Sequence, residues 1–428
     1  MFRDLATFAT VWLFANLISF LPYSLLHKLG NGIGKLLYHM VPKFRKRTLS
    51  NLSLAKSLNL SELQKATVAK ESFSNLVINC LEYAKLKRDR KLHKRLICEN
   101  PELAARLIKS GQGVIFFCAH QANFEALFLE GTSRMPGVAV GNQFKNRYLT
   151  QWITSIRERF GGKILTQDEV IKEGMRALKK GKFLGLVGDQ SLPSGGYYAP
   201  FLGTGAWTSP APAMLSYKMK CPLIFASIRR EKGKYYIHYS EPVWPNREKP
   251  MKEEINRLMQ SMIEPLEKSI AQNPGQWMWQ HNKWKQETPE NVYYQFRHET
   301  ILIILPKGNK FDSLLPMFEK IYPNAFLTLQ LPTAKKLPFS GETIYYENQS
   351  DLFQTDTQTK LVFNFSGNDQ LKRHYLKQTA FEVVDLADLE RIAYEKQFVK
   401  CDDIRETLVR AICRPEYFPK SEVIKCPT

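Results

Sequence analysis

The sequence lacks the cysteine and histidine patterns that mark disulfide frameworks and metal sites. Its 428 residues include seven cysteines and eight histidines, and no Cys-x-x-Cys pair occurs. The cysteines are Cys80, Cys98, Cys118, Cys221, Cys401, Cys413 and Cys426. An odd, scattered set of this kind is typical of reduced thiols in the cytoplasm. We therefore expect no metal site and no cofactor.

Acidic residues are also in short supply. The chain has 41 acidic residues against 61 basic ones, which gives a formal net charge of +20. Such an excess favours polyanionic partners, namely nucleic acid, anionic lipid, phosphorylated substrates or acidic proteins. The basic runs carry no interleaved aromatic residues, so nucleic acid is the weaker option. The length favours two domains, and a hydrophobic content of 44% can fill sizeable cores.

One long stretch near the N-terminus lacks charge altogether. Leu5–Leu26 contains 22 uncharged residues, enough to span a bilayer as a helix. Asn16 and Pro22 weaken that interpretation, so a helix lying in the membrane interface is the alternative, and a buried core helix ranks third. No small-x-small cleavage site follows, which argues against a removable signal peptide. Basic residues from Lys28 to Arg47 then place the following chain on the cytoplasmic side.

A second basic run lies at Lys85–Arg95. It follows a predicted helix that starts with a capping box of Ser61 and Gln64 and extends to about Tyr83. A run of charges is usually a solvated helix face, and contact with lipid headgroups is the functional alternative.

The rest of the chain is organised around a histidine and a glutamate five residues apart. The apolar run Gly113–Cys118 predicts a buried strand, and a helix is predicted from Phe124. On one continuous helix such positions point about 140° apart, so His120 and Glu125 can meet only if the first lies in the loop and the second in the helix. Such a pair can act as a general base and its orienter. The spacing alone favours an ordinary loop histidine and a glutamate stabilised by the helix dipole.

The surroundings of this pair resemble a known family. His120, Asn123, Phe124 and Glu125 are similar to the His-(four residues)-Asp/Glu signature of glycerolipid-type acyltransferases, and most similar to the lipid A late acyltransferases, the lauroyl and myristoyl transferases of Gram-negative envelopes. Five further blocks resemble that family in the right order. They are Asn142–Asn146 with Arg157–Gly161, Gly188–Gln190, Tyr198–Thr208, Pro222–Ala226 and Pro274–His281. The family's closing block usually continues His-Arg-Arg, whereas this chain has His281-Asn282-Lys283.

Alternating strand and helix patterns from residue 111 predict an α/β fold. The resemblance covers roughly residues 1–290 and implies a membrane anchor helix at 1–30 and an acyltransferase domain at 31–290, with a mixed sheet flanked by helices. Residues 299–428 match nothing in the family, and their alternation predicts a small C-terminal α/β domain of unknown role with a parallel sheet. Gly308 and Gly367 follow strands there without a phosphate-loop pattern, so a nucleotide site has weak support.

The resemblance implies transfer of a fatty acyl chain from a thioester to a hydroxyl. An attacking alcohol needs a base, for which His120 is the candidate, with Glu125 fixing its tautomer. The oxyanion needs a donor, for which Arg159 ranks slightly ahead of Arg157. Either arginine could instead pair with a phosphate or a carboxylate at a helix C-terminus, where arginine is favoured anyway. Catalysis is thus assigned to His120, Glu125 and Arg159.

Four side chains are candidates for substrate binding: Asn123, Arg157, Asp189 and Phe201. Asp189 ends an apolar strand and is expected to hold one of the arginines or to contact the acceptor. Asn123 is expected mainly to cap the helix predicted from Phe124. Phe201 could line an acyl groove, although buried aromatics are more often plain core. An acyl-enzyme on Cys118 is the less favoured route, because burial makes a cysteine inert, and direct transfer is expected.

The resemblance also implies partners and a location. The donor would be an acyl-carrier-protein thioester, the acceptor a lipid A precursor, and the anionic membrane surface a further partner. The enzyme would sit at the bacterial inner membrane with its catalytic domain on the cytoplasmic face. Two alternatives stay open: a different glycolipid or glycerolipid acceptor, and a membrane-bound lipid-binding scaffold without activity.

Overall fold

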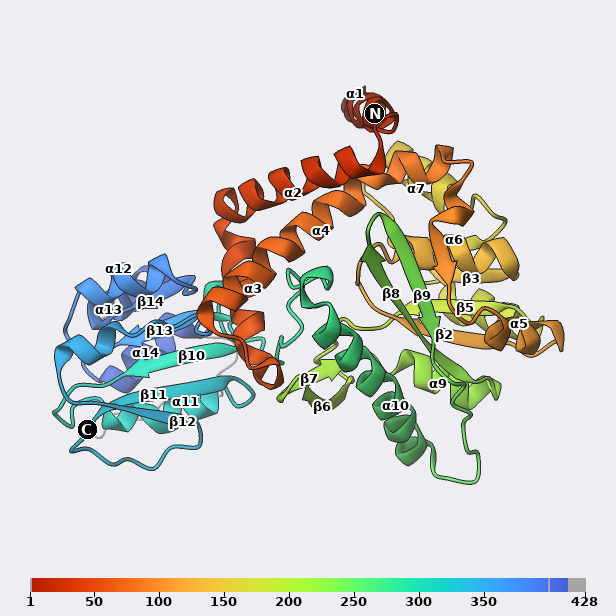
Figure 1. Ribbon diagram of the computed structural model, residues 1–428. Coiled ribbons are helices and arrows are strands. Elements are labelled where there is room, and N and C mark those ends of the chain that lie inside the picture. Colours follow the sequence, from red (N-terminus) through yellow and green to blue (C-terminus); the bar gives the residue numbers. More distant parts are fainter. Residues whose placement is uncertain (1, 399–400, 415–428) are drawn as a thin grey trace. The chain divides into compact units, whose positions relative to one another are not determined.

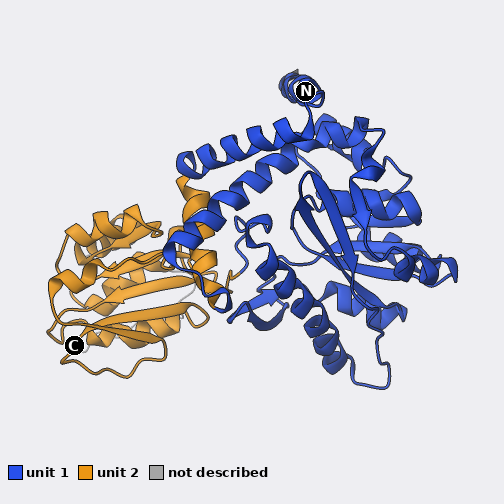
Figure 2. Ribbon diagram, viewed as in Figure 1, with its two compact units in different colours: residues 1–41, 57–283 blue, residues 42–56, 284–428 orange. Residues whose placement is uncertain are grey.

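The computed structural model describes residues 2–398 and 401–414 (Figure 1). The chain divides into two compact units (Figure 2): unit 1 comprises residues 1–41 and 57–283, and unit 2 comprises residues 42–56 and 284–428. The sequence predicts residues 42–56 within the acyltransferase domain, whereas the structure groups them with unit 2. None of the six described cysteines forms a disulfide, and Cys426 lies outside the described residues.

The uncharged N-terminal stretch forms two helices rather than one. Helix α1 (Phe2–Ile18) ends before Pro22, and α2 (Tyr23–Met40) begins after it. Proline has no backbone N–H and disfavours a helical conformation in the residue before it, so one helix does not continue through this point. Within residues 2–398 and 401–414, no helix has the length and apolarity required to cross a bilayer. The predicted membrane-spanning helix over Leu5–Leu26 is therefore not supported.

Unit 1 is built on a seven-stranded mixed sheet flanked by helices, which confirms the predicted fold class. The strand order is β1-β9-β8-β2-β5-β3-β4, and all neighbours are parallel except β8 and β9. The strands are β1 (Leu96–Cys98), β2 (Val114–Cys118), β3 (Gly137–Val140), β4 (Lys163–Leu165), β5 (Phe183–Val187), β8 (Leu223–Glu231) and β9 (Lys234–Tyr239). Strand β2 is buried along its whole length, as expected for an apolar run in the middle of a parallel sheet.

Helices and one hairpin complete unit 1 (Figure 1). The helices are α4 (Glu62–Arg88), α5 (Glu102–Lys109), α6 (Glu125–Arg134), α7 (Arg147–Arg157), α8 (Met175–Lys179), α9 (Ala211–Met219) and α10 (Met251–Gln272), and the hairpin pairs β6 (Tyr197–Phe201) with β7 (Thr204–Thr208). The predicted capping box of Ser61 and Gln64 starts α4. Helix α2 lies against α4 at Gly34, where a Cβ atom would come within 2.3 Å of the Ser74 backbone. Only glycine permits this approach.

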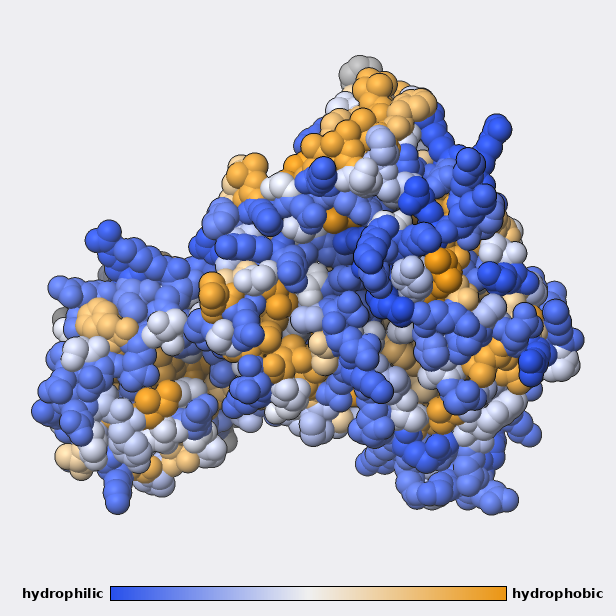
Figure 3. Space-filling view, viewed as in Figure 1, coloured by the Kyte–Doolittle hydropathy of each residue, from blue (hydrophilic) through white to orange (hydrophobic). Residues whose placement is uncertain are grey.

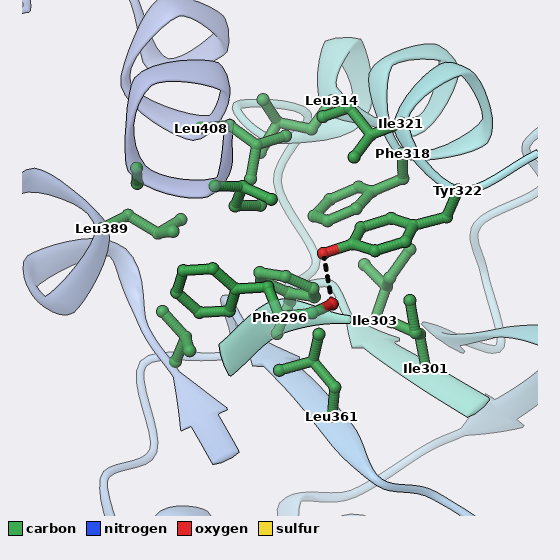
Figure 4. Close-up of a cluster of buried hydrophobic side chains, with 14 of the residues drawn as sticks. Phe296, Ile301, Ile303, Leu314, Phe318, Ile321, Tyr322, Leu361, Leu389 and Leu408 are labelled. Atoms are coloured by element: carbon green, nitrogen blue, oxygen red, sulfur yellow. Dashed lines mark hydrogen bonds between the residues drawn. The ribbon is translucent and has the colours of Figure 1, made fainter. Parts of the chain in front are cut away.

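Unit 2 contains the predicted parallel sheet, with strand order β12-β11-β10-β13-β14. The strands are β10 (Thr300–Ile304), β11 (Phe326–Pro332), β12 (Glu342–Tyr346), β13 (Leu361–Asn364) and β14 (Glu382–Val384), and the helices are α3 (Pro42–Leu54), α11 (Leu315–Ile321), α12 (Gln370–Lys377), α13 (Leu386–Gln397) and α14 (Ile404–Ile412). Aliphatic and aromatic side chains fill its core (Figure 4). The Tyr322 hydroxyl, buried among them, donates to the Phe296 carbonyl at 3.2 Å.

Helix α3 joins unit 2 although about 230 residues separate it from the rest of that unit. Its Lys46 ammonium donates to the Ala380 carbonyl at 2.6 Å, and the Ser50 hydroxyl donates to the Gln358 carbonyl at 2.6 Å. Ser50 is completely buried. These bonds satisfy backbone carbonyls at the amino ends of β13 and β14, so α3 is a structural part of unit 2.

Replacing Ser50 by alanine is expected to lower the free energy of unfolding of unit 2 by about 1–3 kcal/mol, because the Gln358 carbonyl then loses a buried partner. Denaturant titration of the full chain would measure this change. Ser110→Ala, at an exposed position in unit 1, is the control and is expected to stay within about 0.5 kcal/mol of the parent. Equal effects of the two substitutions would contradict the structural role of α3.

Candidate active site

His120 lies in the loop between β2 and α6, as the sequence predicts. The Ala122 N–H donates to the Gln276 carbonyl at 2.7 Å, and the His120 carbonyl accepts from the Met278 N–H at 3.0 Å. The side-chain amide of Asn75, on α4, donates to the Ala122 carbonyl at 3.3 Å. These bonds hold Ala122 at a φ of 45°, a left-handed conformation that alanine rarely adopts. The loop backbone is therefore fixed from two sides.

The partner of the imidazole is Asp189. This residue follows β5, the parallel neighbour of β2, so both side chains emerge at the carboxyl edge of the sheet. One Asp189 carboxylate oxygen lies 2.7 Å from His120 Nδ1. The other accepts from the His120 backbone N–H at 2.9 Å and from the Trp277 indole N–H at 2.8 Å. Three donors therefore fix one carboxylate that is only 3% exposed.

Glu125 does not orient His120 as the sequence analysis expected. It opens α6 and directs its carboxylate to Arg157, at the end of α7. The guanidinium donates twice, from Nε at 2.8 Å and from Nη2 at 2.5 Å, and the Tyr83 hydroxyl donates to the same carboxylate. A bidentate contact from arginine satisfies both oxygens of a carboxylate, whereas one imidazole nitrogen satisfies a single oxygen. Asp189 likewise differs from its prediction, since it holds the histidine and neither arginine.

The charges around the site set the protonation of this pair. Burial opposes protonation of His120, but the carboxylates of Asp189 and Glu125 outweigh it and raise the pKa of the imidazole above its ordinary value. The pKa of Asp189 is held far below its usual range despite burial, chiefly by the His120 contact. An ionised carboxylate can only accept, so Nδ1 carries the hydrogen and Nε2 keeps its lone pair. That nitrogen can receive a proton.

A cleft of about 590 Å³ opens at His120. One part of its lining is polar and includes Asn142, Gln190 and Ser209; another part is apolar and is formed mainly by aliphatic side chains of η3 (Val170–Gly174), α8 and α9. A smaller cavity of about 70 Å³ lies beside the cleft, and its lining is mostly apolar. The two hollows share Phe124, Val140, Arg157 and Val187. Arg157 therefore forms part of the wall of both.

Arg159, the favoured oxyanion donor of the sequence analysis, does not reach this cleft. Its guanidinium donates to the carbonyls of Leu86 and Asp89 at the end of α4. It lines a different hollow, which contains neither His120 nor Arg157. The last carbonyls of a helix have no partner within the helix, so they attract a cation. Arg159 thus lies at a helix C-terminus, but it binds backbone carbonyls there, whereas the sequence suggested a phosphate or a carboxylate as its partner.

Two other predicted substrate-binding residues point away from the cleft. The Asn123 amide donates at 2.7 Å to Glu82, a fully buried carboxylate, and no side-chain cap is formed at the start of α6. Phe201 is 1% exposed, packs on Trp277 and lies outside the cleft lining, so it is core.

Cys118 is the residue weighed for an acyl-enzyme. Burial raises the pKa of its thiol, which disfavours a thiolate nucleophile.

The closing block supplies site residues to which the sequence analysis gave no role. The His281 ring lies 4.7 Å from that of His120, centroid to centroid, and Trp277 binds Asp189. Lys283 occupies the position where the family usually has arginine. It is buried, donates to the Thr208 hydroxyl at 2.7 Å, and burial lowers its pKa to about 7. The family resemblance was the only signal in the sequence that joined this block to His120.

The fold and this site define an α/β enzyme with an imidazole–carboxylate pair suited to general-base chemistry. Residues 2–286 match the family of bacterial lipid A biosynthesis acyltransferases. The chain belongs to that family and is an acyltransferase of lipid A biosynthesis, as the resemblance predicted. A lipid A biosynthesis acyltransferase of Haemophilus influenzae is 25% identical over 281 residues, which cover 63% of this chain and 85% of the relative.

Proposed function

We propose that the enzyme transfers a fatty acyl chain from an acyl-carrier-protein thioester to a hydroxyl of a lipid A precursor, with His120 as the base. The observation that carries this proposal is the His120–Asp189 pair, whose imidazole lines a cleft with polar and apolar walls. His120 Nε2 takes the proton of the acceptor hydroxyl as its oxygen attacks the thioester carbonyl. The carbon–sulfur bond then breaks, and the leaving thiolate recovers the proton from the imidazolium.

Arg157 is the donor that we assign to the oxyanion, in place of Arg159. Its Nε and Nη2 atoms bind Glu125, and its side chain lines the cleft beside His120. A guanidinium held in one orientation at the cleft wall can donate a hydrogen bond to the carbonyl oxygen as that oxygen becomes negative. Glu125 acts through Arg157 and is a positioning residue. Asp189 positions His120 and fixes its tautomer.

The proposed place of action is the cytoplasmic face of the bacterial inner membrane. Helix α1 exposes a set of large apolar side chains (Figure 3): Leu5, Val11, Trp12, Leu13, Phe14 and Leu17. Leu13, Phe14 and Leu17 are 55%, 57% and 61% exposed, which is far from a core environment. A helix with such a face can lie in the interfacial layer of a bilayer. The +20 charge suits both an acidic carrier protein and a phosphorylated acceptor.

The test is an assay of purified protein with a panel of acyl-carrier-protein donors and a lipid A precursor. We expect mass spectrometry to find a product heavier by one acyl chain, and we expect His120→Ala to lose that product while retaining its fold by circular dichroism. Full activity of His120→Ala would refute the assigned base. Glycerolipid acceptors in the same panel test the alternative substrate class, and trapping of a labelled acyl-enzyme would contradict direct transfer.

A further inference from the structure

A second large cavity, of about 920 Å³, lies in unit 1 and shares no lining residue with the cleft at His120. Three parts of the chain form it: the turn between α1 and α2 with the first residues of α2 as far as His27, the end of α4 with the residues that follow, and the turn between β8 and β9. The basic run Lys85–Arg95 therefore does not simply face solvent. Part of it surrounds a hollow.

Positive charge dominates the wall of this cavity. Its basic side chains are Lys85, Arg88, Arg90, Lys91, Arg95 and Lys232. The single carboxylate in the lining, Asp89, is engaged by the Tyr23 hydroxyl at 3.1 Å and by Arg95 at 3.5 Å. One internal anion cannot balance six cations that share a hollow. An anionic ligand would lower their mutual repulsion.

Some of these cations build the site and others are available to a ligand. The Lys85 ammonium donates to the carbonyls of Ser19 and Leu21 at 2.8 and 2.6 Å, which holds the turn between α1 and α2 in place. In the described part of the chain, the side chains of Arg90, Lys91 and Lys232 have no ion-pair partner. All three are exposed. The cavity thus combines a fixed frame with exposed cations that have no ion-pair partner among the described residues.

The rim of the cavity is apolar on the side of α1. Phe20 lines the cavity, is 75% exposed, and its ring lies 5.0 Å from the Arg88 guanidinium. Leu17 and Leu13 continue the apolar surface along α1. A free phosphate ion would need only the cations, and an acidic protein would not need exposed leucines. A membrane lipid presents a phosphate directly beside hydrocarbon, which matches both parts of this surface.

We propose that this cavity binds the phosphate of an anionic glycerophospholipid headgroup while Phe20 and the apolar side chains of α1 contact its acyl region. Arginine and lysine donors surround the phosphate oxygens. The lipid serves as an anchor at a defined site and is not a substrate. The inference rests on the proposed membrane contact of unit 1 and is independent of the proposed acyl transfer.

The test compares flotation of the full chain with vesicles of phosphatidylcholine alone and of phosphatidylcholine containing phosphatidylglycerol. We expect the parent to bind the anionic vesicles better, and Arg90→Gln with Lys91→Gln to weaken that binding about 10- to 30-fold. The matched control replaces Lys179 and Lys180, two exposed lysines of the same unit, by glutamine and is expected to change binding less than about threefold. Lys232→Asn repeats the test from a different element.

Each outcome decides the proposal. Equal losses in the two double variants would show diffuse attraction between charges and would overturn the site, as would equal binding of the parent to both kinds of vesicle. A calorimetric titration with inorganic phosphate forms a further arm: phosphate binding that Arg90→Gln with Lys91→Gln removes, with vesicle binding unchanged, would assign the cavity to a free anion. Acyl transfer in detergent micelles, measured in parallel, is expected to be unchanged in all variants, so failure of the two proposals can be told apart.

Discussion

Asp189→Asn is expected to lower kcat about 10⁴-fold. In the parent, both Asp189 oxygens accept hydrogen bonds, from the His120 ring and from the His120 and Trp277 N–H groups. An asparagine keeps one acceptor and must place its NH₂ group against Nδ1. The imidazole then carries its hydrogen on Nε2 and has no lone pair for the acceptor hydroxyl. Steady-state kinetics with purified variants would measure the loss, and circular dichroism would show that the fold is kept.

The pH dependence of the same variant separates an electrostatic role from a structural one. The base must be neutral to act, so kcat/KM of the parent is expected to fall as the pH drops through the raised pKa of His120. Without the Asp189 charge that pKa decreases, and the acidic limb of the residual activity moves to lower pH. Asp168→Asn, on the surface, is the control and is expected to match the parent in rate and in profile. An unshifted limb in Asp189→Asn would contradict this assignment.

The second large effect is expected at the Glu125–Arg157 pair. Their side chains are only 9% and 14% exposed, so Arg157→Met leaves an unpaired carboxylate inside the protein. Breaking such a pair is expected to cost about 3–5 kcal/mol of unfolding free energy. Loss of the oxyanion donor is expected to lower kcat about 10²- to 10³-fold. Denaturant titration and initial rates measure the two quantities separately.

The double variant Glu125→Gln with Arg157→Met distinguishes stability from catalysis. Removal of both charges relieves the unpaired carboxylate, so most of the lost stability is expected to return. Activity is expected to stay low, because the positive charge beside His120 is still missing. Recovery of both properties would reduce the pair to a structural element and would remove Arg157 from the mechanism.

The sequence predicted the positions of the site residues along the chain better than their pairing. Apolar runs identified β2 and β5, and these placed His120 and Asp189 at strand ends. Which carboxylate reaches the imidazole depends on strand order, because β2 and β5 are neighbours in space but about 65 residues apart in the chain. Local spacing could offer only Glu125. Arg157, at the end of α7, binds Glu125, and tertiary packing likewise brings these two residues together.

Other differences have the same physical origin. Arg157 is the last residue of α7 and Arg159 lies in the turn that follows, so they project in different directions, one to the cleft and one to α4. The sequence cannot tell which of the two arginines faces the cleft, because both are of the same residue type in the same segment. The uncharged N-terminal stretch was long enough for a membrane span by residue count, yet Pro22 divides it. The strand-helix alternation of unit 2 could be predicted from the sequence because its central parallel strands are short apolar runs.

The placement of α3 affects the order in which the protein can be completed during synthesis. Ser50 leaves the ribosome 308 residues before its acceptor Gln358. At typical elongation rates that interval is roughly 15–60 seconds. During this interval α3 is already synthesised, but the residues that it binds in unit 2 are not. A chain that stopped near residue 286 would keep α3 without Gln358 and Ala380, the carbonyl partners of its Ser50 and Lys46.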